Sequence, residues 1–357
     1  MSIKTTGPTL KGRLIALAVG LVLATVISEA VLRSAMPHWR EFFSGWFMHS
    51  IYVPKMGWVR TGKPGFDGYF AQNNGDFRVR IKINARGFRD PEPAAKAAGQ
   101  IWVIGDSMAF GWGVERNEMY SEVIARELGR PVYNVASPGA DVCGYQRLYA
   151  HMPKKARPSV VVVGLILEND LANYDCATED VDPTTKILEK EESVGWGSLS
   201  GIKQSLAKYS ALYNFFSVSL KRVDIVNEAL IKLGLVKSIN VKRRAISPEK
   251  VKVIVEKTAD ELERLKRMIP KGVPFVILMA PMRYELKYGD EGSRNIRQKM
   301  AAELARRGLR VIDPIKEFTK AGYKAIHFAH DGHWSARGHE IAGRKTARFL
   351  KKILADR

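Results

Sequence analysis

Cysteine is scarce in this chain, and its scarcity narrows the class of protein. The 357 residues include only Cys143 and Cys176, far too few for a small fold held together by disulfides. Two isolated cysteines are more often simply buried, although these two could pair in an oxidising compartment. Internal repeats and long low-complexity tracts are also missing. With 46% hydrophobic residues, the chain can bury a sizeable core in one large domain or two ordinary ones.

Acidic residues are in short supply. The chain has 37 Asp and Glu against 57 Lys and Arg, which gives a net charge of +20. This excess favours contact with an anionic partner such as a membrane surface, an acidic polymer or nucleic acid. Because the sequence has neither the spacing of a zinc finger nor an aromatic RNA-binding motif, nucleic acid ranks last. We therefore expect no nucleic-acid partner.

One charge-free apolar run stands near the N-terminus. It covers Leu14–Ser28, and Ala30–Leu32 extends it past Glu29. The length is borderline between the core of a signal peptide and a short membrane helix. Basic residues before the run favour a cytoplasmic N-terminus, and no clean cleavage site follows it. We expect residues 1–33 to be an uncleaved, single-pass anchor in the inner (cytoplasmic) membrane, with the rest of the chain outside the cytoplasm.

Residues 34–98 carry many aromatic residues between glycine and proline breaks. Within them Phe77–Asn84 alternates strictly between apolar and polar residues, which predicts a half-exposed strand. Pro91–Gln100 has the composition of a linker. We expect residues 34–98 to form a small β-rich cap that connects the anchor to the main domain.

Residues 99–357 alternate short apolar runs with helical patterns. Such alternation predicts an α/β domain in which helices cover both faces of a parallel sheet. The expected strands are Ile101–Gly105, Val132–Ala136, Ser159–Ile166, Pro274–Ala280 and Leu309–Ile312. The expected helices are Asn117–Leu128, Val251–Met268, Ser293–Arg307 and Ala336–Leu354.

An insertion at about residues 171–247 separates the third and fourth expected strands. Its apolar residues recur at steps of three and four and are surrounded by lysines, which predicts a long helix or a helical hairpin. One interpretation is a hairpin packed on the sheet with a solvated basic face. The other is a lid, or a surface that meets acidic lipid or acidic polysaccharide.

Polar motifs follow three of the expected strands directly. Ser107 ends the first strand in Gly-Asp-Ser, Gly139 ends the Ser-Pro-Gly motif after the second, and Asn169 follows the third. The carboxyl ends of parallel strands form one edge of the sheet, so these residues should project to the same place. Asp331 and His333 lie in a loop between the fifth strand and the last helix.

These residue types fit nucleophilic catalysis by a serine. Such catalysis needs a base to take the proton of the hydroxyl and a carboxylate to orient that base. Ser107 would be the nucleophile, His333 the base and Asp331 the orienting carboxylate. The backbone N–H groups of Ser107 and Gly139 and the side chain of Asn169 could form an oxyanion hole.

Other interpretations of the same residues remain. Asp106 fits a turn-stabilising carboxylate better than an acid catalyst, and His339 fits a brace for the loop. His330 with Asp331 and His333 could ligate a metal, but no third ligand group has suitable spacing, so we expect neither a metal nor a cofactor. Trp112 and Trp334 could line an acyl pocket or belong to the core.

Taken together, the motifs resemble those of the SGNH hydrolase superfamily, also called GDSL-like esterases. Gly105–Ser107 resembles its first block, Asn134–Gly139 its second, Asn169–Asp170 its third and Asp331–His333 its last. The resemblance implies a three-layer α/β/α sandwich with a flavodoxin-like, five-stranded sheet. It also implies the roles just given to Ser107, His333, Asp331, Gly139 and Asn169.

Two features depart from the common family pattern. Leu167 stands where the third block usually has glycine, and the last block is one residue shorter than the usual Asp-x-x-His. The shorter form is similar to that of a membrane-linked, periplasmic branch that acts on acetyl groups of bacterial polysaccharides. Val79–Arg89 and Phe110–Val114 also resemble that branch.

Three functions follow as hypotheses. The first is a serine esterase that hydrolyses acyl esters, acetyl esters above all, on a cell-envelope polysaccharide. The second is an O-acyltransferase in which a sugar hydroxyl replaces water. The third is an anchored, non-catalytic glycan-binding protein, which the intact Ser107, Asn169, Asp331 and His333 disfavour.

Overall fold

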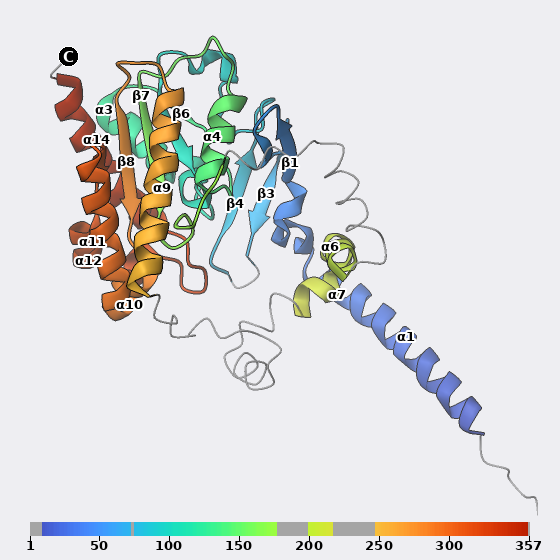
Figure 1. Ribbon diagram of the computed structural model, residues 1–357. Coiled ribbons are helices and arrows are strands. Elements are labelled where there is room, and N and C mark those ends of the chain that lie inside the picture. The colour runs from blue at the N-terminus through green and yellow to red at the C-terminus, as the bar shows by residue number, and fades with distance from the viewer. Residues whose placement is uncertain (1–8, 73–74, 177–198, 217–246, 356–357) are drawn as a thin grey trace, which may run out of the picture. The chain divides into compact units, whose positions relative to one another are not determined.

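The computed structural model describes residues 9–72, 75–176, 199–216 and 247–355 (Figure 1). By its internal contacts the chain divides into two units. The larger unit comprises residues 47–192 and 238–357, and the smaller comprises residues 1–46 and 193–237. Each unit is described by itself.

A five-stranded parallel sheet forms the centre of the larger unit. Its strands stand in the order β6-β5-β7-β8-β9, and all four neighbouring pairs are parallel. The five strands expected from the sequence and the flavodoxin-like order are thereby confirmed. The strands are β5 (Ile101–Gly105), β6 (Val132–Asn134), β7 (Val160–Ile166), β8 (Phe275–Ala280) and β9 (Arg310–Ile312).

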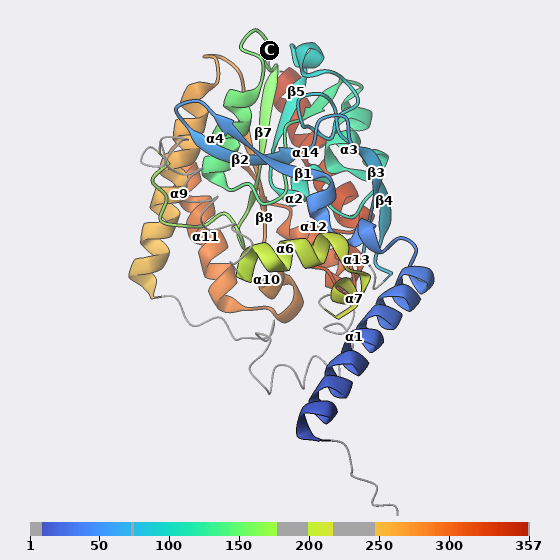
Figure 2. The same cartoon turned by 90° about the vertical axis from the view of Figure 1, so that its right-hand side faces the viewer.

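Helices cover both faces of this sheet, as the three-layer prediction requires (Figure 2). Alternate strand residues point to opposite faces: Trp102 and Ile104 belong to one hydrophobic core, and Ile101 and Val103 to the other. The first core includes residues of α4 (Val142–His151), α9 (Pro248–Met268) and α11 (Glu291–Arg306). The second includes residues of α2 (Ser107–Phe110), α3 (Tyr120–Leu128), α12 (Ile315–Ala321), α13 (Tyr323–Ile326) and α14 (Ala336–Ala355).

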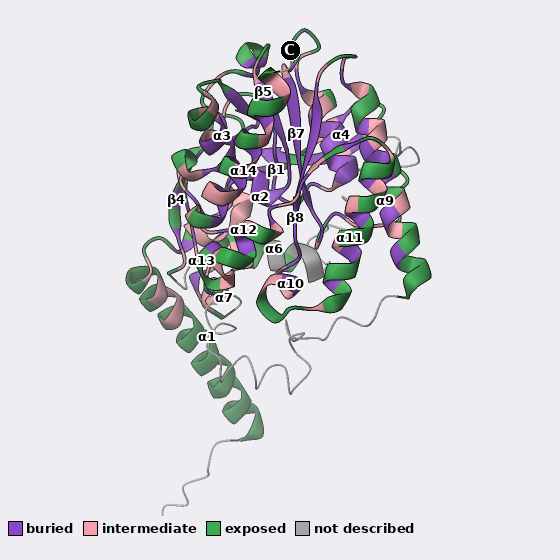
Figure 3. Cartoon of the chain, turned by 90° about the vertical axis from the view of Figure 1, so that its left-hand side faces the viewer, coloured by how far each residue is buried: buried purple, intermediate pink, exposed green. Residues whose placement is uncertain are grey.

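The helices lie where the apolar patterns predicted them, with additions. Asn117–Leu128 is divided between the 3-10 turn η4 (Arg116–Glu118) and α3, and α3 ends at Gly129 in the left-handed conformation, with φ +62°. The sequence analysis did not predict α4, α12, α13 or α10 (Arg283–Tyr288). The four strands β5 to β8 are buried along their whole length, while the outer faces of the helices are exposed (Figure 3), so the layers are amphipathic in the expected sense.

Two antiparallel hairpins of the expected β-rich region belong to the larger unit. The first joins β1 (Met48–Val53) to β2 (Gly57–Gly62), and the second joins β3 (Asp67–Ala71) to β4 (Arg78–Lys82). Along β4, exposed and buried residues alternate, as predicted for Phe77–Asn84. The short 3-10 turn η3 (Ala94–Ala97) precedes β5. The predicted domain boundaries at residues 33 and 98 stay a prediction.

The smaller unit contains the apolar N-terminal run. This run forms α1 (Leu10–Ala35), with a mean hydropathy of 2.4 over its most apolar 18-residue window and no buried residue. The helix is long and apolar enough to cross a membrane. It is followed by η1 (Trp39–Phe42) and η2 (Ser44–Trp46).

Part of the predicted helical insertion also lies in the smaller unit. It forms α6 (Leu199–Tyr209) and α7 (Ala211–Asn214). The Glu29 carboxylate of α1 accepts hydrogen bonds from the N–H groups of Ala211 and Leu212, at 2.9 Å each, and therefore caps α7. Residues 177–198 and 217–246 of the insertion lie outside the described residues.

Candidate active site

The site begins where β5 ends and α2 starts. The Asp106 carboxylate caps α2 by accepting from the N–H of Met108 at 2.8 Å, the turn-stabilising role expected for it. A Cβ on Gly105 would lie 2.6 Å from the Cβ of Ala109 and 3.2 Å from the carbonyl oxygen of Gly164, so only glycine allows the close turn. This turn places Ser107 at the carboxyl edge of the sheet.

The structure brings Ser107, His333 and Asp331 together. The Ser107 Oγ lies 2.7 Å from the His333 Nε2, and the His333 Nδ1 contacts Asp331 Oδ1. The same carboxylate oxygen accepts the backbone N–H of His333 at 2.9 Å. With Nδ1–H donating to Asp331, Nε2 is left as an acceptor for the serine proton. Ser107 and His333 are 226 residues apart in the sequence, so the fold alone brings them together.

Gln72 and Trp112 add to this arrangement, and no sequence motif points to Gln72. The Gln72 side-chain amide donates to the second oxygen of Asp331 at 2.6 Å. The indole of Trp112 stacks on the imidazole of His333, with centroids 5.3 Å apart. Trp334, by contrast, is 1% exposed and packs edge-on against Phe318. Of the two interpretations given for these tryptophans, Trp334 is therefore a core residue, whereas Trp112 touches the site.

The loop between β6 and α4 contributes Gly139. It adopts φ +78°, which favours glycine. One hydrogen bond, from the N–H of Ser137 to the carbonyl of Gly105 (3.0 Å), connects this loop to the end of β5. Within the described residues, the backbone N–H groups of Ser107 and Gly139 donate no hydrogen bond. Both remain available to a ligand, as an oxyanion hole requires.

Asn169 lies beside the turn that carries the serine. Its side-chain amide donates to the Asp106 carboxylate at 3.4 Å. Asn169 is exposed to solvent. The next residue, Asp170, is fully buried and accepts from the Tyr145 hydroxyl at 2.7 Å and the N–H of Ile166 at 2.6 Å. Burial raises the pKa of Asp170 well above its usual value, and the nearby Asp106 adds to this. Asp170 thus fixes the turn that presents Asn169.

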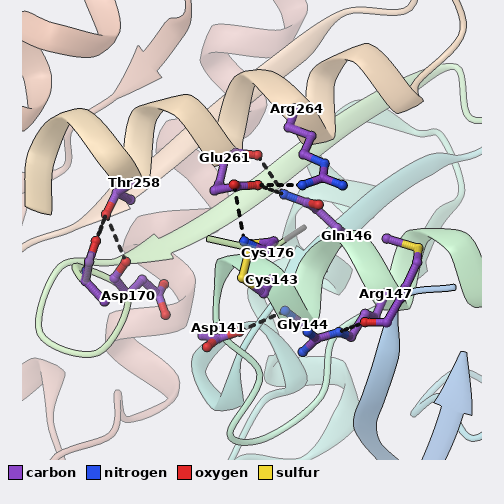
Figure 4. The surroundings of a disulfide bond; sticks show 12 residues. Asp141, Cys143, Gly144, Gln146, Arg147, Asp170, Cys176, Thr258, Glu261 and Arg264 are labelled. Carbon is purple, nitrogen blue, oxygen red and sulfur yellow. Dashed lines mark hydrogen bonds and ion pairs between the residues drawn. A yellow bond between two sulfur atoms is a disulfide. The ribbon is translucent and has the colours of Figure 1, made fainter. Parts of the chain in front are cut away.

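A disulfide joins Cys143 of α4 to Cys176, with Cα atoms 5.3 Å apart (Figure 4). The expectation that the two cysteines are more often simply buried was therefore wrong, because the chain after β7 returns to α4. Glu261 of α9 reinforces this link: its carboxylate accepts from the N–H of Cys176 at 3.3 Å and from the amide of Gln146 at 2.7 Å. The loop that carries Asn169 is consequently tied to two helices.

A buried arginine, which the sequence analysis included in Val79–Arg89 without a role, supports the other side of the site. Arg89 is 2% exposed. Its guanidinium donates to the carbonyls of Gly111 at 2.6 Å, Val114 at 2.9 Å and Arg80 at 3.0 Å. Burial lowers the pKa of Arg89 to about 10, so the group stays charged at neutral pH. It fixes the segment 110–114, which carries Trp112.

The remaining histidines near the loop have other partners. The His330 Nδ1 lies 3.0 Å from Asp76. The His339 Nδ1 accepts from the N–H of Tyr120 at 3.2 Å, and its ring meets Trp334 edge-on, as expected of a brace. Burial lowers the pKa of His339 to about 3 and that of His327 to about 4. Among the described histidines, only His333 is hydrogen-bonded to Ser107.

No protein-family model matches the chain, and no curated protein matches it. Among solved structures, a member of the lipolytic protein G-D-S-L family from Veillonella parvula is 14% identical, with 71% of this chain and 99% of that chain covered and a TM-score of 0.39. A carbohydrate esterase family 2 enzyme with a carbohydrate-binding domain from Corynascus thermopiles is 15% identical, covering 74% and 68%, with a TM-score of 0.42. The lipase/acylhydrolase from Enterococcus faecalis is 14% identical, covering 71% and 96%, with a TM-score of 0.40.

Proposed function

We propose that this chain is a serine esterase of the SGNH type. The single observation that supports it most is the 2.7 Å contact between Ser107 Oγ and His333 Nε2, with Asp331 on the opposite ring nitrogen. The five-stranded sheet agrees with the fold that the motif resemblance implies. The four blocks follow one another in the family's order along the sequence.

The chemistry follows from the positions of these groups. His333 takes the proton of Ser107 as the serine oxygen attacks the ester carbonyl carbon. The backbone N–H groups of Ser107 and Gly139 and the amide of Asn169 stabilise the negative oxygen that forms. Protonated His333 then gives its proton to the departing alcohol, which leaves an acyl group on Ser107. A water molecule, deprotonated by His333, releases the acid and restores the serine.

The proposed substrate is an acyl ester, acetyl in the first instance, on a cell-envelope polysaccharide. Support comes from the short Asp331-x-His333 spacing, which resembles that of the branch acting on polysaccharide acetyl groups. The Cys143–Cys176 disulfide supports an oxidising compartment outside the cytoplasm. Together with α1 it supports a single-pass inner-membrane protein with its catalytic domain on the far side of the membrane.

The test of this function uses the full chain in detergent. Wild type should hydrolyse p-nitrophenyl acetate, and Ser107→Ala should lower kcat/KM about a thousandfold or more. Ser159→Ala is a matched control, because Ser159 precedes β7 at the opposite edge of the sheet. Equal rates for wild type and Ser107→Ala would refute the esterase.

An O-acyltransferase remains the alternative, because a sugar hydroxyl can replace water at the same acyl-serine. Acylated sugar that accumulates only when an acceptor sugar is supplied would favour it over hydrolysis. The non-catalytic hypothesis is favoured if wild type and Ser107→Ala both lack esterase activity while glycan binding persists.

The anchor and its boundaries have a separate test. Residues 1–33 as an uncleaved anchor, followed by residues 34–98 as a cap, predict membrane retention of the product with an intact N-terminus. Recovery of a soluble product shortened at the N-terminus would instead show that α1 is a cleaved signal peptide.

A further inference from the structure

Arg60 lies against the glycine assigned to the oxyanion hole. Its guanidinium Nη1 lies 3.5 Å from the point that a Cβ on Gly139 would occupy. A side chain at position 139 would therefore contact this cation, whereas glycine leaves the space beside it open. The position of Arg60 on β2 is set by the pairing of that strand with β1, in which Arg60 stands opposite Ser50.

The side chain of Arg60 makes no polar contact with any residue that the structure describes. The residue is exposed, and no ion pair or hydrogen bond of its guanidinium occurs among the described residues. Two other arginines near the site differ from Arg60, because their guanidinium groups have partners. Arg283 forms an ion pair with Glu168 at 2.6 Å, and the two terminal nitrogens of Arg89 donate to backbone carbonyls. Arg60 is thus a positive charge with free donors at the edge of the proposed oxyanion hole.

We propose that Arg60 binds an anionic group of the substrate, so that the enzyme acts on acyl esters carried by an acidic polymer. A guanidinium presents paired N–H donors that match the two oxygens of a carboxylate. Because the proposed acetyl group carries no charge, a carboxylate bound to Arg60 beside Gly139 belongs to the alcohol part of the ester. The net charge of +20 favours approach of the same kind of polymer. This inference rests on the proposed esterase function and names its substrate class.

The test compares two esters that differ only in charge, 3-acetoxybenzoate and 3-acetoxybenzamide. Wild type should prefer the benzoate in kcat/KM. Arg60→Gln should lower kcat/KM for the benzoate about tenfold or more, mainly through KM, the range expected for hydrogen bonds to a charged group, and leave the benzamide within about twofold. Arg60→Lys should restore part of the preference. Arg310→Gln, which removes an exposed arginine at the start of β9, should change neither ester.

A binding measurement tests the role of Arg60 independently of catalysis. In the Ser107→Ala background, retention of oligogalacturonate should weaken on Arg60→Gln and stay unchanged on Arg310→Gln, with neutral dextran oligomers as the uncharged probe. Equal retention of the two variants would overturn the proposal, and so would a loss of activity that is the same for both esters. If wild type hydrolyses neither ester, the esterase function fails, and the retention measurement still decides the role of Arg60.

Discussion

The indole of Trp112 lies on the imidazole of His333, with ring centroids 5.3 Å apart and planes inclined by 26°. The indole is held in turn by the ring of Phe70, 4.5 Å away by centroids, and by the backbone of segment 110–114 that Arg89 fixes. The orientation of the proposed base therefore depends on a buried cation that touches neither the serine nor the histidine.

Arg89→Met should lower both stability and activity. The substitution leaves the carbonyls of Gly111, Val114 and Arg80 without their donor, at a cost of about 1–3 kcal/mol for each buried group left unpaired. Denaturant unfolding should show a loss of several kcal/mol, and kcat of the remaining folded enzyme should fall about tenfold while KM changes little. Trp112→Phe, which keeps an aromatic ring on His333, should retain most of kcat. A folded Arg89→Met enzyme with wild-type kcat would contradict the positioning role.

Asp331→Asn should lower kcat more than most other single substitutions. An amide at this position can offer N–H to His333 and so favour the wrong tautomer, and in Ser-His-Asp triads this loss is about four decades in kcat. Stopped assays at fixed substrate should therefore detect almost no turnover, while the melting temperature stays close to that of wild type. Gln72→Leu removes only the outer hydrogen bond to Asp331 and should cost far less. A Gln72→Leu loss as large as that of Asp331→Asn would show that the two act as one unit.

The sequence predicted the sheet well, because each strand is a short apolar run bounded by glycine, proline or polar residues. It also placed Ser107, Gly139 and Asn169 at one edge, since strand ends of a parallel sheet share that edge, whereas Asp331 and His333 were joined to them by the motif resemblance. Gln72 and Arg89 could not be assigned roles in the same way. The partner of Gln72 is 259 residues away, and those of Arg89 are backbone carbonyls, which leave no pattern in side-chain identity.

Cysteine pairing and α4 escaped prediction for a related reason. The apolar residues Tyr145 and Leu148 of α4 are mixed with glycine and polar residues, so the helical period is weak in so short a segment. Whether Cys143 meets Cys176 depends on the path of the chain after β7, which passes α4 and α9. Local sequence carries no information about that path.

The double variant Cys143→Ser with Cys176→Ser should be less stable and less active. The bridge spans 33 residues, and removing a cross-link of that span costs about 3–4 kcal/mol through the entropy of the unfolded chain. Because the bridge also restrains the loop of Asn169, kcat should fall more than KM changes. The fall should be smaller than that of Asn169→Ala, for which the loss of one oxyanion donor predicts about a hundredfold or more. Unchanged kcat in the folded double variant would separate the bridge from the site and leave it a purely structural link.

His339 should make the protein sensitive to acid. Burial lowers its pKa from 6.5 to about 3. Below about pH 6.5 the unfolded chain therefore binds a proton at His339 that the folded protein does not bind. Stability is therefore complete above pH 6.5 and falls as the pH drops toward 3, by up to about 1.4 kcal/mol per pH unit from this group. His339→Asn keeps an oxygen to accept the N–H of Tyr120 but cannot take up the proton. Its free energy of unfolding, measured in urea from pH 7.5 to pH 4.5, should decline less steeply than that of wild type.

The comparison at pH 7.5 supplies the control for this measurement, because both proteins are then uncharged at position 339 and differ only in packing. His327, with its pKa lowered to about 4 by burial, acts in the same direction, so the variant should keep part of the acid dependence. Because the free energy of unfolding of wild type declines more steeply than that of His339→Asn, the two curves should converge as the pH falls. If they stay parallel over the whole range, His339 takes up its proton equally in both states, and the buried ring stacked near Tyr120 is not the source of acid sensitivity.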